Sequence, residues 1–227
     1  MNDIYLNKYR IKNLEPLSDK SKGVNGVCYK YKNGVIKIFR YDLNSHYKEN
    51  ILSHLKKDSK IILWPKALVF EKGFFTDKLK GYYMDKAPND NLLNIRNKVL
   101  HDNMDITFDQ ILYIYYEKFL PELKNKNVLL SDVKMGHIFL DDNLYLTDTD
   151  NFTIEEKSGE IYKCNLSQVN FCMKMLFDNL MNSSLRNNIN YKNTYEDEFI
   201  YDMIKNIRSK TNGEACSLLS LKNYNNC

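Results

Sequence analysis

Two β-prone runs near the start of the chain, joined by a short turn, constrain the fold most strongly. The runs are Val27–Tyr31 and Val35–Phe39, and Lys32-Asn33-Gly34 lies between them. An Asn-Gly pair between such runs is the strongest short-range signal of a β-hairpin. Lys37 lies inside the second run, VIKIF, where a lysine is costly to bury unless an anionic group faces it. The alternative is a lysine at a strand edge whose ammonium group reaches water.

The remaining patterns divide the chain into two parts. The first part continues with a helix over Ser45–Lys57 and a strand pair at Ala67–Glu71 and Leu79–Met84, before a polar break at Asp85–Pro88. The second part is mainly helical, with helices over 107–123, 166–181 and 195–209 and short strands at His137–Leu140 and Leu144–Thr147. Thr107 is a predicted N-cap. We therefore expect an α+β fold of two lobes, 1–85 with an antiparallel sheet and one helix, and 86–227, mainly helical.

Composition excludes several classes of function. The 227 residues carry a net charge of +4, which suits an anionic ligand but is too small to indicate a nucleic-acid binder. The five cysteines are scattered and odd in number, which argues against a disulfide framework or a structural zinc site. The N-terminus has no apolar signal region, and no stretch approaches the roughly 20 apolar residues that span a bilayer. We expect a cytoplasmic protein with no membrane partner; the sequence does not test secretion by a non-classical route.

Two features of the first part are suited to binding phosphate. Gly23 and Gly26 lie just before the first strand, and glycines let a backbone approach phosphate oxygens, although two glycines are also typical of an ordinary turn. Glu49 is the only acid in the Ser45–Lys57 helix and is the local candidate to pair with Lys37. Such a pair would aim the ammonium group at phosphate. Taken alone, Glu49 is more typical of a solvated helix face.

The second part carries two acidic loops. In the first loop, Asp132 and Lys134 are two residues apart, so the acid could accept a hydroxyl proton while the amine neutralises a transferring phosphate. In the second loop, Asp148-Thr149-Asp150 follows an apolar strand. Carboxylates at that position suit Mg²⁺, which prefers oxygen ligands. An Asp-rich turn with no metal is the alternative.

Taken in order, these motifs resemble the eukaryotic-type protein kinase superfamily. They are a glycine-rich loop (GVNG), a strand lysine (VIK), a helix glutamate, a catalytic loop (SDVKMGH) and a metal aspartate (DTD), with GYYMDKAP similar to the strand that leads into the hinge. The DTDNF element is particularly similar to compact bacterial kinase-like proteins whose metal motif reads Asp-Thr-Asp. The likeness covers about residues 15 to 180.

The resemblance implies a role for each matching residue. Gly23 and Gly26 would cover the phosphates of ATP, Lys37 paired with Glu49 would contact the α- and β-phosphates, and Asp132 would orient the acceptor hydroxyl with Lys134 near the γ-phosphate. Asp148 would hold Mg²⁺. The adenine edge would be recognised by backbone groups of Met84, Asp85, Lys86 and Ala87. The side chains of Val35 and Phe139 would lie above and below the base.

Three departures from the family pattern qualify these roles. His137 stands where the family has a metal-binding Asn, and imidazole is a poor ligand for Mg²⁺ but acceptable for softer ions. We hypothesise that Asp150 supplies the missing oxygen, with a preference for Mn²⁺ as one consequence; alternatively, His137 packs in its loop. No Ala-Pro-Glu motif follows, and only about 15 residues separate Asp150 from the next helix, so the C-terminal lobe is expected to be reduced.

Three functions remain open from the sequence. The leading one is an ATP-dependent phosphotransferase of the Ser/Thr protein kinase type, which moves the γ-phosphate to a hydroxyl on an unidentified protein. The second is a pseudokinase that binds nucleotide or a partner protein, and the third is a small-molecule kinase. Retention of Lys37, Glu49, Asp132, Lys134 and Asp148 together favours catalysis, because a scaffold does not need all five.

Overall fold

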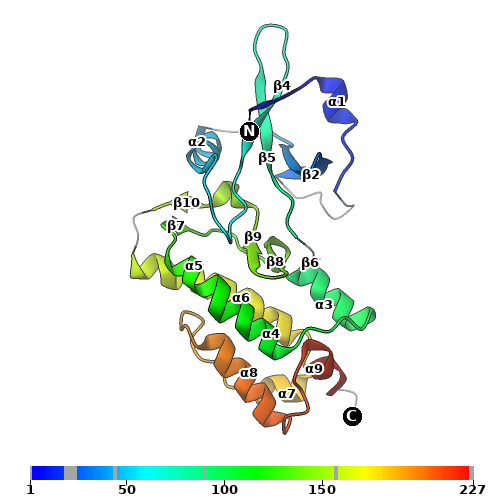
Figure 1. The fold of residues 1–227 in the computed structure, drawn as a ribbon, viewed down its shortest axis with the longest axis vertical. Coiled ribbons are helices and arrows are strands. Elements are labelled where there is room, and N and C mark those ends of the chain that lie inside the picture. The colour runs from blue at the N-terminus through cyan, green and yellow to red at the C-terminus, as the bar shows by residue number, and fades with distance from the viewer. Residues whose placement is uncertain (1, 18–24, 43–44, 89, 156–157, 225–227) are drawn as a thin grey trace. The chain divides into compact units, whose positions relative to one another are not determined.

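The computed structural model describes residues 2–17, 25–42, 45–88, 90–155 and 158–224. The chain forms two compact units, one of Met1–Ala87 with Thr147–Phe152 and one of Pro88–Leu146 with Thr153–Cys227. Thr147–Phe152, which contains the predicted metal aspartates, therefore belongs to the same unit as Lys37. Figure 1 labels the elements.

A five-stranded sheet forms the centre of the first unit, in the order β1-β4-β5-β3-β2. The strands are β1 (Ile4–Leu6), β2 (Gly26–Tyr31), β3 (Gly34–Phe39), β4 (Ala67–Glu71) and β5 (Lys78–Asp85). The predicted hairpin of β2 and β3 and the predicted pair of β4 and β5 are confirmed, both antiparallel.

The expected all-antiparallel sheet with a single helix is wrong in two details. β1 pairs with β4 in parallel, so the sheet is mixed. A helix α1 (Lys8–Lys12), capped by the Asn7 side chain, precedes the predicted helix, which is α2 (Ser45–His54). β1 has three residues and α1 has five. Both elements are too short to show a hydrophobic periodicity in the sequence.

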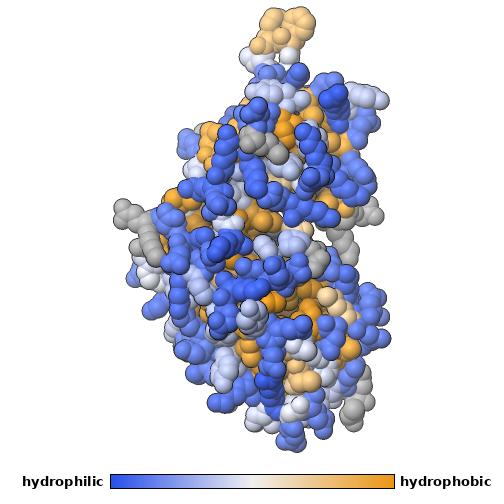
Figure 2. Space-filling model, viewed as in Figure 1, coloured by the Kyte–Doolittle hydropathy of each residue, from blue (hydrophilic) through white to orange (hydrophobic). Residues whose placement is uncertain are grey.

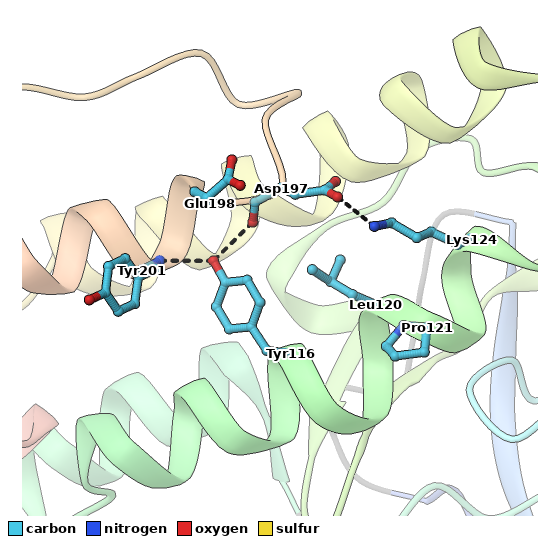
Figure 3. Close-up of a pocket in the computed structure, with 7 residues that line it drawn as sticks. All are labelled: Tyr116, Leu120, Pro121, Lys124, Asp197, Glu198 and Tyr201. Carbon is cyan, nitrogen blue, oxygen red and sulfur yellow. Dashed lines mark hydrogen bonds and ion pairs between the residues drawn. The ribbon is translucent and has the colours of Figure 1, made fainter.

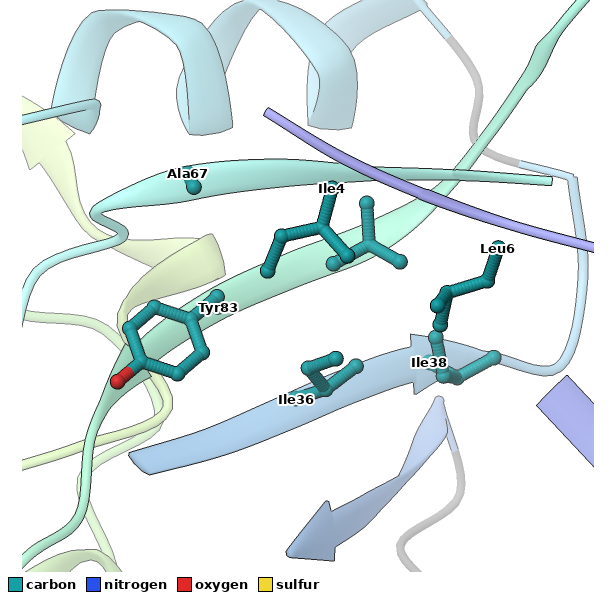
Figure 4. Packing of buried hydrophobic residues seen from close by; sticks show 7 residues of the cluster. Ile4, Leu6, Ile36, Ile38, Ala67 and Tyr83 are labelled. Carbon is teal, nitrogen blue, oxygen red and sulfur yellow. The ribbon is translucent and has the colours of Figure 1, made fainter. Parts of the chain in front are cut away.

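Strand β3 is buried on both faces, which explains why its sequence is continuously apolar around Lys37. Ile36 and Ile38 point into one cluster, which includes Leu6 of β1 and Tyr83 of β5 (Figure 4). Val35 and Phe39 point into a second cluster on the opposite face, with Ile51 of α2, Leu68, Tyr82 and Met84. Because side chains alternate along a strand, Lys37 shares the face of Val35 and Phe39.

The second unit is mainly helical. Its helices are α3 (Leu92–His101), α4 (Phe108–Tyr113), α5 (Leu120–Lys124), α6 (Gly159–Asp178), α7 (Ser183–Asn187), α8 (Phe199–Lys210) and α9 (Leu218–Tyr224). Short strands β6 (Asp90–Asn91), β8 (Ile138–Leu140) and β9 (Leu144–Leu146) form one sheet, and β7 (Val128–Leu129) and β10 (Thr153–Ile154) form another. None of the helices described is both long and apolar enough to cross a bilayer.

The predicted helix over 107–123 is confirmed, but its middle turn is wider than an α-helix. Thr107 caps α4 in a capping box with Gln110, as predicted for its N-terminus. A π-helical segment, η2 (Ile114–Phe119), connects α4 to α5, and the Leu120 N–H donates to the Tyr115 carbonyl. Pro121, at the start of α5, has no N–H for the preceding turn. A local change of helix type is typical near such a residue.

Gly81 gives the first testable prediction, because a Cβ there would lie 1.8 Å from the backbone oxygen of Lys37. A side chain at this position would push β5 away from β3, so Gly81→Ala should lower the free energy of unfolding by about 1–3 kcal/mol. The matched control is Gly159→Ala at the start of α6, where an added Cβ meets nothing within 4 Å. Urea denaturation of both variants checks this; equal stabilities would contradict the packing described for β5 against β3.

Candidate functional site

Lys37 and the Asp148-Thr149-Asp150 segment come together in the first unit. The Lys37 ammonium forms ion pairs with Asp148 and, at 2.7 Å between Nζ and Oδ1, with Asp150. Lys37 is only 6% exposed, and its Nζ lies 5.5 Å from the ring centre of Phe39. Of the two interpretations open from the sequence, the lysine that faces anions is confirmed, and the lysine that reaches water is wrong.

Contacts between aromatic side chains anchor the acidic segment within the first unit. Asp148 adopts a left-handed backbone conformation with φ of 62°, and the turn η4 (Thr149–Asn151) follows it. Phe152, directly after this turn, meets the edge of Trp64, whose ring in turn packs on His54 of α2 at 4.7 Å between centres. Buried aromatic contacts therefore hold the end of the acidic turn at Phe152, and the ion pair with Lys37 holds its start at Asp148.

Burial and charge act against each other in this cluster. Burial alone would lower the pKa of Lys37, but Asp150 and Asp148 outweigh it and the pKa is raised. Burial raises the pKa of Asp150 and Asp148 raises it further, against the opposing effect of Lys37. One lysine thus faces two carboxylates, and with both carboxylates ionised the cluster of Lys37, Asp148 and Asp150 has more negative than positive charge.

Tyr82 completes the cluster and was not identified from the sequence. Its hydroxyl donates to the same Asp150 Oδ1 that accepts from Lys37, at 3.0 Å, and the side chain is fully buried. Tyr82 lies opposite Lys37 in the register of β5 against β3. Pairing the two predicted strands would have placed a tyrosine of β5 opposite Lys37. That neighbour was the signal from which Tyr82 could have been identified.

The predicted pairing of Lys37 with Glu49 is wrong. α2 turns Ile51 and His54 inward, both with 0% of their surface exposed. Glu49 precedes Ile51 by two residues, about 200° around the helix, and is exposed. The helical spacing of Leu52 and Leu55 predicts that both face the sheet, but Leu52 is 53% exposed. The negative charge that Lys37 needs comes from Asp148 and Asp150 instead.

The donor atoms around Asp150 fit a divalent cation of the magnesium type. Asp150 Oδ2 is buried without a hydrogen-bond partner among the described residues, so it has an oxygen lone pair available next to Asp148. Mg²⁺ is commonly held by one or two carboxylates, with water and phosphate oxygens completing the shell. No group of three or more His, Cys, Asp or Glu side chains suitable for a metal occurs in the part of the chain that the structure describes. Asp148 and Asp150 would be the protein ligands.

Asp132 and Lys134 lie in the second unit and pair with each other. Lys134 Nζ is 2.7 Å from Asp132 Oδ2, and both side chains are more than half exposed. Asp132 adopts a left-handed conformation with φ of 56°, as Asp148 does. Such backbone is uncommon outside glycine and is concentrated at functional sites. His137 Nδ1 lies 3.0 Å from the Asp132 carbonyl oxygen, so the imidazole contacts its own loop.

Amide side chains of α6 support the loop that carries Asp132. Asn165 is fully buried; it donates to the Val128 carbonyl at 2.7 Å and accepts from the Leu130 N–H at 2.8 Å. Gln168, one turn later, donates to the Leu130 carbonyl at 2.6 Å. Neither residue was singled out from the sequence. Their spacing of three residues on one helix face was the only signal.

The other predicted binding residues are placed as follows. Gly26 begins β2, where an added Cβ would lie 2.6 Å from the Ile38 carbonyl oxygen, and Gly23 lies outside the described residues. Val35 and Met84 are core residues of the first unit, Asp85 pairs with Lys66, and Lys86 and Ala87 follow β5. Phe139 is half-buried in β8 of the second unit. An adenine position between Val35 and Phe139 stays a prediction.

A separate hollow of about 450 Å³ lies in the second unit, between α5 and the start of α8. Figure 3 shows Tyr116 at its centre, with a hydroxyl that donates to the Asp197 carbonyl at 2.9 Å and accepts from the Tyr201 N–H at 3.0 Å. Lys124 pairs with the Asp197 carboxylate at 2.5 Å. The hollow contains none of the residues predicted to carry chemistry.

Comparison with known proteins gives no match, either to a family model or to a curated protein.

His54 gives a prediction about pH. Burial lowers the pKa of His54 to about 4 and Lys57 acts in the same direction, while a backbone contact with Thr149 acts oppositely. The folded protein therefore binds the proton less well than the unfolded chain, whose histidine titrates near 6.5, so stability falls as the pH drops below about 6.5. Between pH 7.5 and 5.5 the loss attributable to His54 should be about 1 kcal/mol.

Urea denaturation at both pH values, with wild type and His54→Phe, measures this contribution. The phenylalanine keeps an aromatic ring against Trp64 and does not titrate. We expect the wild type to lose more stability than the variant on acidification. Equal losses would show that His54 is not protonated preferentially in the unfolded chain.

Asn165 gives a prediction about the Asp132 loop. Asn165→Leu keeps the approximate side-chain size but leaves the Val128 carbonyl and the Leu130 N–H without their partners, so it should lower the free energy of unfolding by about 2–4 kcal/mol. Hydrogen exchange should report faster exchange of the Leu130 amide. Asn179→Leu, at the exposed end of α6, is the matched control, since its amide donates to the Met175 carbonyl of its own helix. A similar small effect of both changes would contradict a supporting role for Asn165.

Proposed function

We propose that this protein is an ATP-dependent phosphotransferase with a two-lobed protein kinase-like fold. It would transfer the γ-phosphate to a hydroxyl, on a Ser or Thr of a protein substrate. One observation carries the proposal: a lysine of a core strand is held against both carboxylates of an Asp-Thr-Asp turn that is distant in the sequence. That combination is suited to gathering a polyphosphate, a cation and the charge of a transferring phosphoryl group in one place.

The residues divide the chemistry as follows. Lys37 would contact phosphate oxygens, since its ammonium is a buried donor that is already aimed at anions. Asp148 and Asp150 would hold Mg²⁺ or Mn²⁺, which when bound neutralises and orients the phosphate oxygens. Asp132 would orient the acceptor hydroxyl and accept its proton, with Lys134 close by to stabilise negative charge. Tyr82 would keep Asp150 in position through the shared Oδ1.

A nucleotide- or protein-binding module without transfer is the second candidate. The observation that favours it is the direct ion pair between Asp132 and Lys134, because a carboxylate oxygen already engaged by its neighbour is less available to accept a hydrogen bond from a substrate hydroxyl. The contact of His137 with its own loop acts in the same direction, since it offers no oxygen ligand where the kinase pattern has an Asn.

Radiolabelled ATP distinguishes these candidates. We expect phosphate transfer to the chain itself or to a general acceptor protein in the presence of Mg²⁺ or Mn²⁺. Asp148→Asn and Asp132→Asn should each reduce transfer by about 10²-fold or more, because each removes a group that acts on the reacting phosphate or hydroxyl. Asp58→Asn is the matched control, since Asp58 is an exposed carboxylate after α2. Asp132 is half exposed, so its variant should fold normally.

Calorimetric titration with ATP separates the outcomes. Binding without transfer in either metal would favour the non-enzymatic candidate. Absence of both binding and transfer would overturn the proposal. Transfer that persists in the folded Asp148→Asn and Asp132→Asn variants would assign the chemistry to other residues.

A further inference from the structure

The hairpin between β4 and β5 ends in two phenylalanines that no other part of the described chain covers. Phe74 is 95% exposed and Phe75 92% exposed, and their rings contact each other edge to face with centres 4.9 Å apart. Two adjacent rings left almost wholly in water contribute nothing to the core. Such an exposed apolar pair is typical of an interaction site.

The turn that presents the two rings has a defined conformation. A Cβ on Gly73 would lie 1.9 Å from the Thr76 carbonyl oxygen, so the close approach requires glycine, and the Gly73 N–H donates to Asp77 Oδ1 at 3.2 Å. Pairing of β4 with β1 ends at Glu71, and pairing of β5 with β3 ends at Gly81. The tip therefore extends beyond the sheet, as the ribbon in Figure 1 and the apolar knob in Figure 2 show.

Below the tip, the surface has more positive than negative charge. Five lysines and three carboxylates line a groove there, the lysines being Lys8, Lys48, Lys72, Lys78 and Lys80. Asp42 pairs with Lys78 at 2.6 Å, and Asp42 and Glu71 lie within 4 Å of Lys80. The other three lysines make no ion pair with a described residue. The hairpin thus has an apolar end, and next to it lie three lysines that make no ion pair with a described residue.

We propose that this hairpin docks the protein on an anionic membrane surface. Phe74 and Phe75 enter the boundary between headgroups and acyl chains, and Lys8, Lys48 and Lys72 contact the headgroups. The two rings lie at the tip and the lysines lie behind them. This order matches a bilayer, in which the apolar acyl chains lie beneath the anionic headgroups. The convex shape also favours a membrane over a protein partner, because a protein would have to provide a pocket for both rings, whereas a bilayer accepts a projecting apolar tip.

This proposal differs from the expectation of no membrane partner and is independent of phosphotransfer. That expectation rested on the absence of a long apolar stretch in the sequence. A search for such stretches identifies only helices that span a bilayer. Two residues at a hairpin tip give no such stretch. Peripheral binding needs only a small apolar insertion supported by charge.

Vesicle sedimentation with the full chain tests the proposal. We expect binding to phosphatidylcholine vesicles that contain about 30% phosphatidylserine, much weaker binding to phosphatidylcholine alone, and weakening when NaCl rises from about 0.05 M to 0.5 M. The double variant Phe74→Ser/Phe75→Ser should lose about tenfold or more of the binding. Phe171→Ser, at a ring that is 55% exposed on α6, is the matched control and should bind as the wild type does.

The alternatives give different results. Failure of the wild type to bind anionic vesicles, or equal binding by the double variant, would overturn the proposal. Self-association of the wild type that the double variant abolishes, without vesicle binding, would identify a second copy of the chain as the partner and would also overturn it. Thermal melting checks that both serine variants are folded. We expect both to fold, because none of the three rings is buried.

Discussion

A lysine in a strand that is buried on both faces is the constraint on which the first unit depends. Removing one partner of a buried ion pair typically costs about 3–5 kcal/mol, so a chain that places Lys37 in β3 must bring carboxylates to it. Those carboxylates come from residues 148 and 150, more than a hundred positions later in the sequence. The assignment of Thr147–Phe152 to the first unit follows from this requirement and from the aromatic contacts of Phe152.

The backbone at the two acidic positions is specialised in the same way. Asp132 and Asp148 both adopt left-handed conformations, which aspartate tolerates better than most residues because its short side chain bonds locally. At Asp148 this conformation starts the tight turn that returns Asp150 to the same lysine. Local strain and long-range charge pairing therefore support each other, since the turn would have little reason to persist without Lys37.

The parts of the fold that the sequence predicted are those with local signals. The Lys32-Asn33-Gly34 turn predicts the β2–β3 hairpin and the N-cap residue Thr107 predicts the start of α4, and both are confirmed. The position of Glu49 was missed because the rotation of α2 is set by Ile51 and His54 packing, which spacing alone did not resolve. Asn165 was missed because its partners are backbone groups of a distant loop, and the sequence does not show which backbone groups lack a hydrogen bond.

The charge balance around Lys37 explains why the site is suited to a further cation. One ammonium between two carboxylates leaves an excess negative charge in a place with little water, which is unfavourable. Burial and the neighbouring Asp148 raise the pKa of Asp150, and its Oδ2 has no hydrogen-bond partner among the described residues. A proton or a divalent ion would remove the excess negative charge. A divalent ion would then leave a positive excess, which is the condition under which a triphosphate is attracted.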